Sequence, residues 1–315
     1  MVVRWQQCYR TFEINALPST IQMLRFFIFQ KKLYLSLDLD DTIKTPDLRG
    51  DGWNALSLSG LILLKWKIVS PEMIYEAAKY NFEPPSLVSR AHKILIKPGA
   101  SYPYPYPFST SREILGTVIE KVKQLSDADI IILEGAANGD PVYPIYKSLG
   151  YDFQRVLMLD VKDCIWVEIE NPLPHPFAVA TFWVPNVVLS CDFLITISSL
   201  RTTANQGFLS IKNLLSLLPV NKYKKGSSGG WASLDEFGWD KVLADLYFTL
   251  PFDLAIVDGR KKFSAPDDSF KGKTENFGKI FEGDPYEIDR EASAMLGLDQ
   301  QYLDTIRAGK AELDS

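Results

Sequence analysis

The chain has 315 residues, of which 46% are hydrophobic and 23% are charged, and its formal net charge is -5 at pH 7. These totals are typical of a soluble globular protein, and the length allows one large domain or two modest ones. The acidic balance and the lack of basic runs argue against nucleic acid as a partner.

The three cysteines, Cys8, Cys164 and Cys191, stand far apart and show no CxxC spacing. This pattern argues against a disulfide framework, a zinc site and an iron–sulfur cluster, and it fits a reducing compartment. The apolar runs are short or interrupted by lysines, so no membrane partner is expected. The first residues lack the apolar core of a signal peptide, and we therefore expect a cytoplasmic protein.

Residues 1–90 show no regular alternation of strand and helix patterns, and we predict that they form an irregular N-terminal extension packed on the main domain. Within them we expect a helix near Ile21 to Phe29, a strand from Leu33 to Thr42 and a short helix from Pro71 to Tyr80.

From residue 93 onward, strand and helix patterns alternate. The expected strands are apolar and rich in β-branched residues, and they cover residues 93–97, 130–134, 156–160, 164–170, 193–197 and 253–258. The expected helices have apolar positions on one face, and they cover residues 112–125, 208–218, 235–247, 285–296 and 300–313. Residues 259–279 are polar and are predicted to be a loop. Residues 91–315 therefore predict an α/β domain with a mostly parallel, Rossmann-like layered sheet and helices on both faces.

In sheets of this kind, ligands bind beyond the carboxyl ends of the strands. The residues at the expected strand ends are mostly charged or hydroxyl-bearing, and they are Lys97, Glu134, Asp160, Ser198 with Arg201, and Asp258. We expect these side chains to converge at one edge of the sheet.

The segment from Asp192 to Pro219 carries the strongest local signal. An apolar strand delivers Ser198, Arg201 and Thr202 to a turn, and the helix that follows contains Lys212 and Asn213. Hydroxyls, cations and free backbone N–H groups at a helix start favour an anion. The sequence therefore predicts an anion site in this segment.

Two resemblances to known families add to this interpretation. LSLDLDDT resembles motif one of the haloacid-dehalogenase superfamily, in which the first aspartate is the phosphoryl nucleophile and the second a general acid/base beside Mg²⁺. The resemblance implies these roles for Asp38 and Asp40, with Thr196 as the strand-end hydroxyl and Gly283 to Asp289 as the later acidic motif. PYEIDREASAML, however, is typical of an amphipathic helix running through that later motif.

The second resemblance spans residues 93–313 and is to the domain-of-unknown-function 362 family. ILIKPG resembles the family's strand ending in Lys-Pro-Asn, with Gly99 in place of the asparagine. LITISSLRTT resembles its strand leading to Lys-Thr-His, with Arg201 for the lysine and Thr203 for the histidine. GFLSIKNLLSLLP is similar to its Lys-Asn helix through Lys212 and Asn213.

Two later segments extend this resemblance. DLAIVDG is similar to the family's late strand ending in Asp258, and EGDPYEIDREASAMLGLD resembles its Asp-Pro-x-x-x-Asp helix through Asp284 and Asp289. Relatives are often fused to ferredoxin-like modules, but this chain has no ferredoxin-type cysteine array, and no iron–sulfur cluster is expected.

Three hypotheses follow. The first is an uncharacterised α/β protein that binds a phosphate- or carboxylate-bearing small molecule through Lys97, Ser198, Arg201, Thr202, Lys212 and Asn213, with Mg²⁺ or Mn²⁺ held by Asp258, Asp284 and Asp289. The second is an Mg²⁺-dependent phosphohydrolase that uses Asp38 and Asp40, and the third is a non-catalytic accessory protein. Whether the chain is an enzyme stays open. Plain structural roles also fit some residues, because Pro285 favours Asp284 as a helix N-cap and Asp258 can cap a loop.

Overall fold

The computed structural model describes residues 2–3, 24–29, 32–37, 73–203, 206–226, 230–266 and 270–313. The chain divides into two compact units, residues 5–71 and residues 1–4 with 72–315. Asp38 and Asp40 lie outside the described residues. In the smaller unit, β2 (Leu24–Phe29) pairs with β3 (Lys32–Leu37) in an antiparallel hairpin. The prediction of a helix near Ile21 to Phe29 is therefore wrong, since aromatic and β-branched residues in LRFFIF favour a strand.

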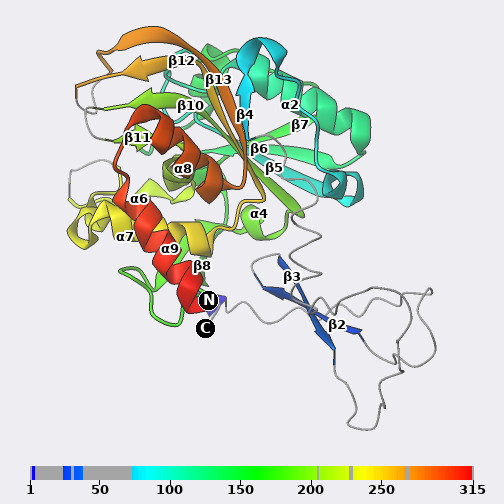
Figure 1. Cartoon of the computed structure of the whole chain (residues 1–315), viewed down its shortest axis with the longest axis vertical. Helices are drawn as coiled ribbons and strands as arrows, with labels where there is room; N and C mark the ends of the chain where they lie inside the picture. The colour runs from blue at the N-terminus through cyan, green and yellow to red at the C-terminus, as the bar shows by residue number, and fades with distance from the viewer. Residues whose placement is uncertain are drawn as a thin grey trace, which may run out of the picture. The chain divides into compact units, whose positions relative to one another are not determined.

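The larger unit is built on one sheet with the strand order β4-β13-β12-β10-β5-β6-β7 (Figure 1). Its strands are β4 (Ile74–Glu76), β5 (Lys93–Pro98), β6 (Asp129–Glu134), β7 (Val156–Asp160), β10 (Phe193–Thr202), β12 (Leu254–Ser264) and β13 (Lys273–Gly283), and the short β11 (Gly207–Phe208) pairs with β10. The run from β12 to β7 is parallel, whereas β13 pairs antiparallel with β12 and β4 pairs antiparallel with β13. The predicted mostly parallel α/β sheet is confirmed.

Two segments at the antiparallel edge of this sheet differ from their predicted structures. Residues 259–279 are not a loop, because β12 continues to Ser264 and β13 returns from Lys273. Most side chains on these hairpin arms are exposed or half-buried, and paired charges such as Lys262 with Glu275 give the arms a polar composition. The helix predicted for Pro71 to Tyr80 is wrong over the described residues 73–80, because β4 pairs with β13 before a 3-10 turn at Ala77–Lys79.

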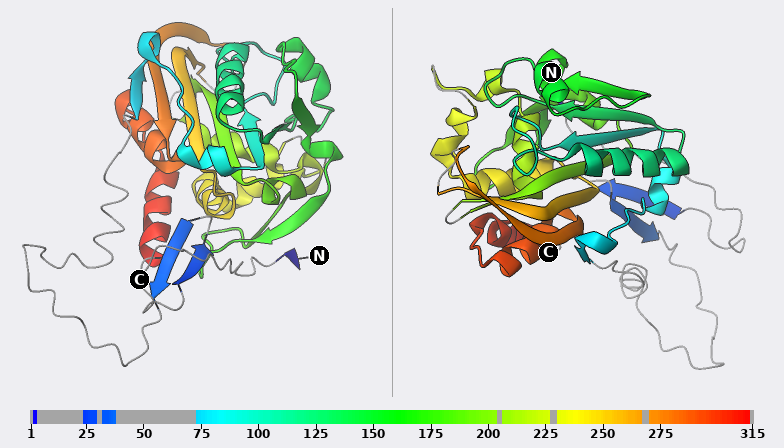
Figure 2. Two further views of the ribbon diagram at one scale, coloured as in Figure 1. Left: turned by 90° about the vertical axis from the view of Figure 1, so that its right-hand side faces the viewer. Right: turned by 90° about the horizontal axis from the view of Figure 1, so that it is seen from above.

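Helices cover both faces of the sheet (Figure 2). Ile94 and Ile96 belong to the apolar cluster that contains α2 (Arg112–Leu125) and α3 (Tyr143–Ser148), whereas Leu95 belongs to the opposite cluster. Side chains of a strand alternate between faces, so this run is apolar throughout. The opposite cluster receives residues from α5 (Ser210–Asn213), α7 (Trp239–Thr249), α8 (Pro285–Leu296) and α9 (Gln301–Leu313).

A second sheet contributes to that opposite cluster. It contains β1 (Val2–Val3), β8 (Trp166–Glu170) and β9 (Thr181–Pro185), and its Ile169 and Phe182 are fully buried. The short helix α4 (Asn186–Leu189) follows β9 in the chain, and the short helix α6 (Val220–Tyr223) lies between α5 and α7. None of the described helices has the length and apolar content needed to cross a bilayer.

The connectivity places a topological switch point between β5 and β10. After β5 the chain adds β6 and then β7 on one side, and it later adds β10 and β12 on the other side. Helical connections therefore leave the carboxyl ends of β5 and β10 in opposite directions, which opens a crevice between them. This is where the fold favours a ligand site.

Candidate functional site

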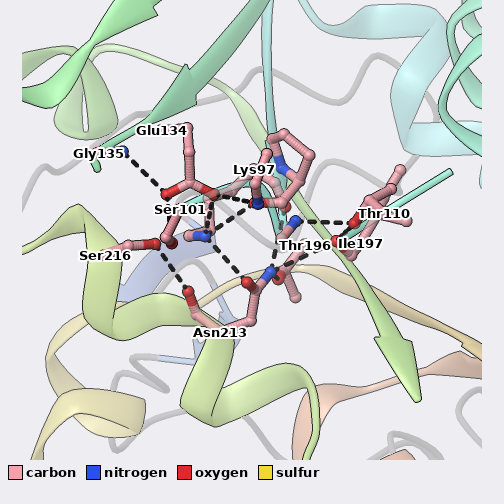
Figure 3. Close-up of polar contacts among 12 residues, drawn as sticks. Lys97, Ser101, Thr110, Glu134, Gly135, Thr196, Ile197, Asn213 and Ser216 are labelled. Atoms are coloured by element: carbon pink, nitrogen blue, oxygen red, sulfur yellow. Dashed lines mark hydrogen bonds and ion pairs between the residues drawn. The ribbon is translucent and has the colours of Figure 1, made fainter. Parts of the chain in front are cut away.

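Lys97, near the end of β5, is fully buried and all its donors are used within the protein. Its ammonium donates to Glu134 Oε2 at 2.8 Å, to Asn213 Oδ1 at 3.0 Å and to the Pro98 carbonyl at 2.9 Å (Figure 3). Burial lowers the pKa of Lys97, and the neighbouring Glu134 carboxylate opposes this shift. An ammonium has three N–H bonds, so Lys97 is suited to holding its neighbours in place and not to contacting an anion directly.

Glu134, at the end of β6, binds both this ammonium and nearby backbone N–H groups. Its carboxylate also accepts hydrogen bonds at 2.9 Å from the backbone N–H groups of Ala100 and Gly135. A Cβ atom at position 135 would lie 2.6 Å from the carbonyl oxygen of Ser216. Glycine at this position therefore allows the end of β6 to approach the 3-10 turn Leu214–Leu217 that follows α5.

Asn213 links this buried pair to β10. Its amide nitrogen donates to Thr196 Oγ1 on β10 at 3.0 Å, while its oxygen accepts from Lys97. A Cβ atom at position 99 would lie 3.1 Å from that oxygen, so Gly99 leaves room for it. Lys97, Thr196 and Asn213 thus tie β5, β10 and α5 together at the switch point.

A cavity of about 420 Å³ opens at this point. Four of the residues predicted for the anion site line it: Ser198, Arg201, Lys212 and Asn213. Lys97 does not line the cavity but is buried and bonds to Asn213, which does. Thr202 does not line the cavity, because its hydroxyl lies 3.0 Å from that of Ser264 on β12. Its predicted place in the site is corrected to a contact between strands.

Two cations converge on one aromatic ring in the cavity wall. The guanidinium carbon of Arg201 lies 4.7 Å from the ring centre of Phe208 and 4.3 Å from that of Phe108. The ammonium of Lys212 lies 3.8 Å from the centre of the Phe208 ring and donates to Gln206 at 3.1 Å. The ring faces hold the cations by their quadrupoles, and the shared ring concentrates positive charge on this side of the cavity.

The hydroxyl groups of Ser198 and Ser199 differ in their hydrogen bonding. Both side chains are buried and both residues line the cavity. Ser199 Oγ donates to the carbonyl oxygen of Phe108 at 2.9 Å, whereas Ser198 Oγ has no partner among the described residues. A buried hydroxyl without a partner is costly, so the Ser198 side chain destabilises this wall.

The predicted metal ligands are held by protein donors at separate places. Asp258 accepts from the guanidinium of Arg260 at 2.9 and 3.0 Å and from the hydroxyl of Tyr106 at 3.1 Å. Asp284 is the N-cap of α8, accepting from the backbone N–H of Tyr286, which confirms that interpretation of the sequence. In the described part of the chain, no group of three or more His, Cys, Asp or Glu side chains could hold a metal ion.

Asp289 instead caps a helix across the fold. It is fully buried on α8 and accepts from Ser210 N at 2.9 Å, Ser210 Oγ at 2.6 Å, Ile211 N at 3.0 Å and the hydroxyl of Tyr302 at 2.9 Å. These backbone groups begin α5, which carries Lys212 and Asn213. Burial raises the pKa of Asp289 to about 6 although the donors oppose the shift. Asp289 therefore positions the site from a distance of 79 residues along the chain.

Comparison with known proteins gives one family. The family model described as Domain of unknown function (DUF362) matches residues 94–294. The structure of the lactate racemase apoprotein from Thermoanaerobacterium thermosaccharolyticum is similar to this chain with a TM-score of 0.44 and 13% sequence identity, over 70% of this chain. The match spans 53% of that protein, about half of its length. Among curated proteins, no match to this sequence is found.

Proposed function

The chain belongs to the DUF362 family, and we propose that its α/β unit binds a phosphate- or carboxylate-bearing small molecule in the cavity at the carboxyl ends of β5 and β10. A volume of about 420 Å³ suits a small-molecule site. Arg201 and Lys212 supply positive charge, and Asn213 is held in a fixed orientation by Lys97 and Thr196. A fixed amide is a preorganised partner, which lowers the entropic cost of binding.

The observation that carries this proposal is the pair of cations on one ring, since Arg201 and Lys212 both lie against Phe208 in the cavity wall. An acceptor oxygen of a phosphate or carboxylate would form charge-assisted hydrogen bonds with these cations. Ser198 lines the same cavity, but its hydroxyl oxygen is buried within the wall.

Replacing Ser198 with alanine is expected to leave the free energy of unfolding of the unliganded protein equal to wild type or up to about 1 kcal/mol higher, since an unsatisfied buried hydroxyl is removed. Ser199→Ala is the matched control and is expected to lose about 1 kcal/mol, because it breaks the bond to Phe108. Urea unfolding of the three proteins measures this contrast. A larger loss for Ser198→Ala than for Ser199→Ala would contradict this expectation, because it would mean that the Ser198 hydroxyl stabilises the unliganded fold.

Lys212→Met is expected to weaken binding of inorganic pyrophosphate or citrate by about tenfold to a hundredfold, since a charge-assisted bond contributes about 1.5–3 kcal/mol. The measurement is isothermal titration calorimetry at low salt. Lys222→Met is a matched control, because Lys222 stacks on Trp183 at the same 3.8 Å but does not line the cavity. If both variants bind like wild type, or if neither anion binds wild type, the anion site is rejected.

A further inference from the structure

A second cavity adjoins the first. It has a volume of about 600 Å³ and lies between the start of α7 and the segment that leads into α9. The two cavities share three lining residues, Gln206, Lys212 and Trp239. These three residues face both cavities, so a ligand that reached from one cavity to the other would pass Lys212.

The two cavities differ in chemistry. The first is lined by flat aromatic rings, which are Tyr102, Phe108, Phe208, Trp231 and Trp239. Phe108 and Phe208 carry Arg201 and Lys212 on their faces, so Tyr102, Trp231 and Trp239 are the rings that would stack on a planar aromatic group. The walls of the second cavity carry carboxylates and amides, which are Asp240, Asp299, Gln300 and Gln301. Carboxylates accept hydrogen bonds from hydroxyl groups and repel a second anion, so this cavity favours a neutral group with several hydroxyls.

The charged residues are also distributed unequally between the two cavities. The cations Arg201 and Lys212 line the first cavity, and Lys212 also lines the second. Among the described residues, one carboxylate, Asp235, lines the first cavity beside the two cations, whereas Asp240 and Asp299 line only the second, whose one cation is the shared Lys212. The expected order along the ligand is therefore an aromatic group, then an anionic linker at the cations, then a polyhydroxyl group.

We propose that the ligand is a nucleoside diphosphate sugar, with its base in the first cavity, its diphosphate beside Arg201 and Lys212, and its sugar in the second cavity. This inference rests on the proposed anion site and extends it. The base would stack on the aromatic wall, the diphosphate would contact the cations, and the sugar hydroxyls would donate to Asp240 and Asp299.

Calorimetric titration of the full chain tests the proposal. The ligands are the diphosphates of adenosine, guanosine, uridine and cytidine, together with the glucose ester of each, its diphosphate glucose. We expect at least one diphosphate glucose to bind about tenfold more tightly than its own diphosphate, as one or two added hydrogen bonds would give. Asp299→Ala is expected to remove this gain, so that the two ligands bind equally. Asp304→Ala is the matched control, because Asp304 lies on α9 outside both cavities and pairs with Arg307 at the surface.

The outcomes separate the two proposals. Equal affinity of every diphosphate glucose and its diphosphate overturns the sugar-nucleotide inference and leaves the anion site standing. A gain that persists in Asp299→Ala also overturns it, because the sugar would then bind elsewhere. Binding of pyrophosphate without any nucleotide rejects the nucleotide class alone, and binding of no anion at all rejects the proposed function as well.

Discussion

Replacing Glu134 with leucine is expected to lower the free energy of unfolding by about 3–5 kcal/mol, because it leaves a buried charge without its partner. The Lys97 ammonium would keep only the two neutral acceptors Asn213 and Pro98. The backbone N–H groups of Ala100 and Gly135 would also lose their acceptor. Urea unfolding followed by tryptophan fluorescence measures the change.

Lys97→Met and the double variant Lys97→Met/Glu134→Leu complete the cycle. Lys97→Met is expected to cost less than Glu134→Leu, since the Glu134 carboxylate keeps its two backbone donors. The double variant is expected to recover part of the loss of Glu134→Leu, because no buried charge is left unpaired. A loss below about 1 kcal/mol in Glu134→Leu, or no recovery in the double variant, would show that the pair is not coupled as its 2.8 Å contact implies.

The sheet was largely predictable because its strands are short apolar runs bounded by turns. KILIK and IIILE became β5 and β6, and the predicted helices 112–125 and 285–296 match α2 and α8. The β12–β13 arms were missed because their side chains are polar and mostly exposed, so apolar periodicity gave no signal there. The Gly259 to Lys261 register shift interrupts the alternation further.

The candidate site was predictable where strand order alone decides it. Ser198 and Arg201 line the cavity because they lie towards the carboxyl end of β10, which flanks the switch point, and Lys212 and Asn213 line it from α5. The hydrogen-bond partners of Lys97 could not be predicted from the sequence. Lys97 bonds to Glu134 and Asn213, which lie 37 and 116 residues away, and a strand-end lysine does not reveal whether it faces a ligand or a carboxylate.

The carboxylates illustrate the same limit. A run of aspartates near strand and helix ends suggests a metal, yet Asp258 is held by Arg260 and Asp289 caps α5. A residue that caps another helix from 79 positions away leaves no local pattern in the sequence. One signal was present, because an aspartate on the apolar side of an amphipathic helix needs buried donors.

Asp289 gives the second large prediction, a stability that falls as the pH rises. Its pKa is raised from 3.8 to about 6 in the folded protein, so the fold binds a proton more tightly than the unfolded chain does. The stabilisation is fully present below about pH 3.8 and is lost as the pH rises through about 6. Between pH 4 and 7, wild type is expected to lose about 2 kcal/mol of unfolding free energy relative to Asp289→Asn, which cannot ionise.

The measurement is urea unfolding of both proteins at closely spaced pH values, and the difference between the curves isolates this carboxyl from the other titrating groups. Tyr302→Phe tests the local cause. It removes a donor that favours the ionised form, so the midpoint of the difference is expected to move to higher pH. Parallel curves for wild type and Asp289→Asn would mean that the four donors outweigh burial and hold Asp289 ionised throughout. In that case α5, with Lys212 and Asn213, would be anchored by a permanent buried charge.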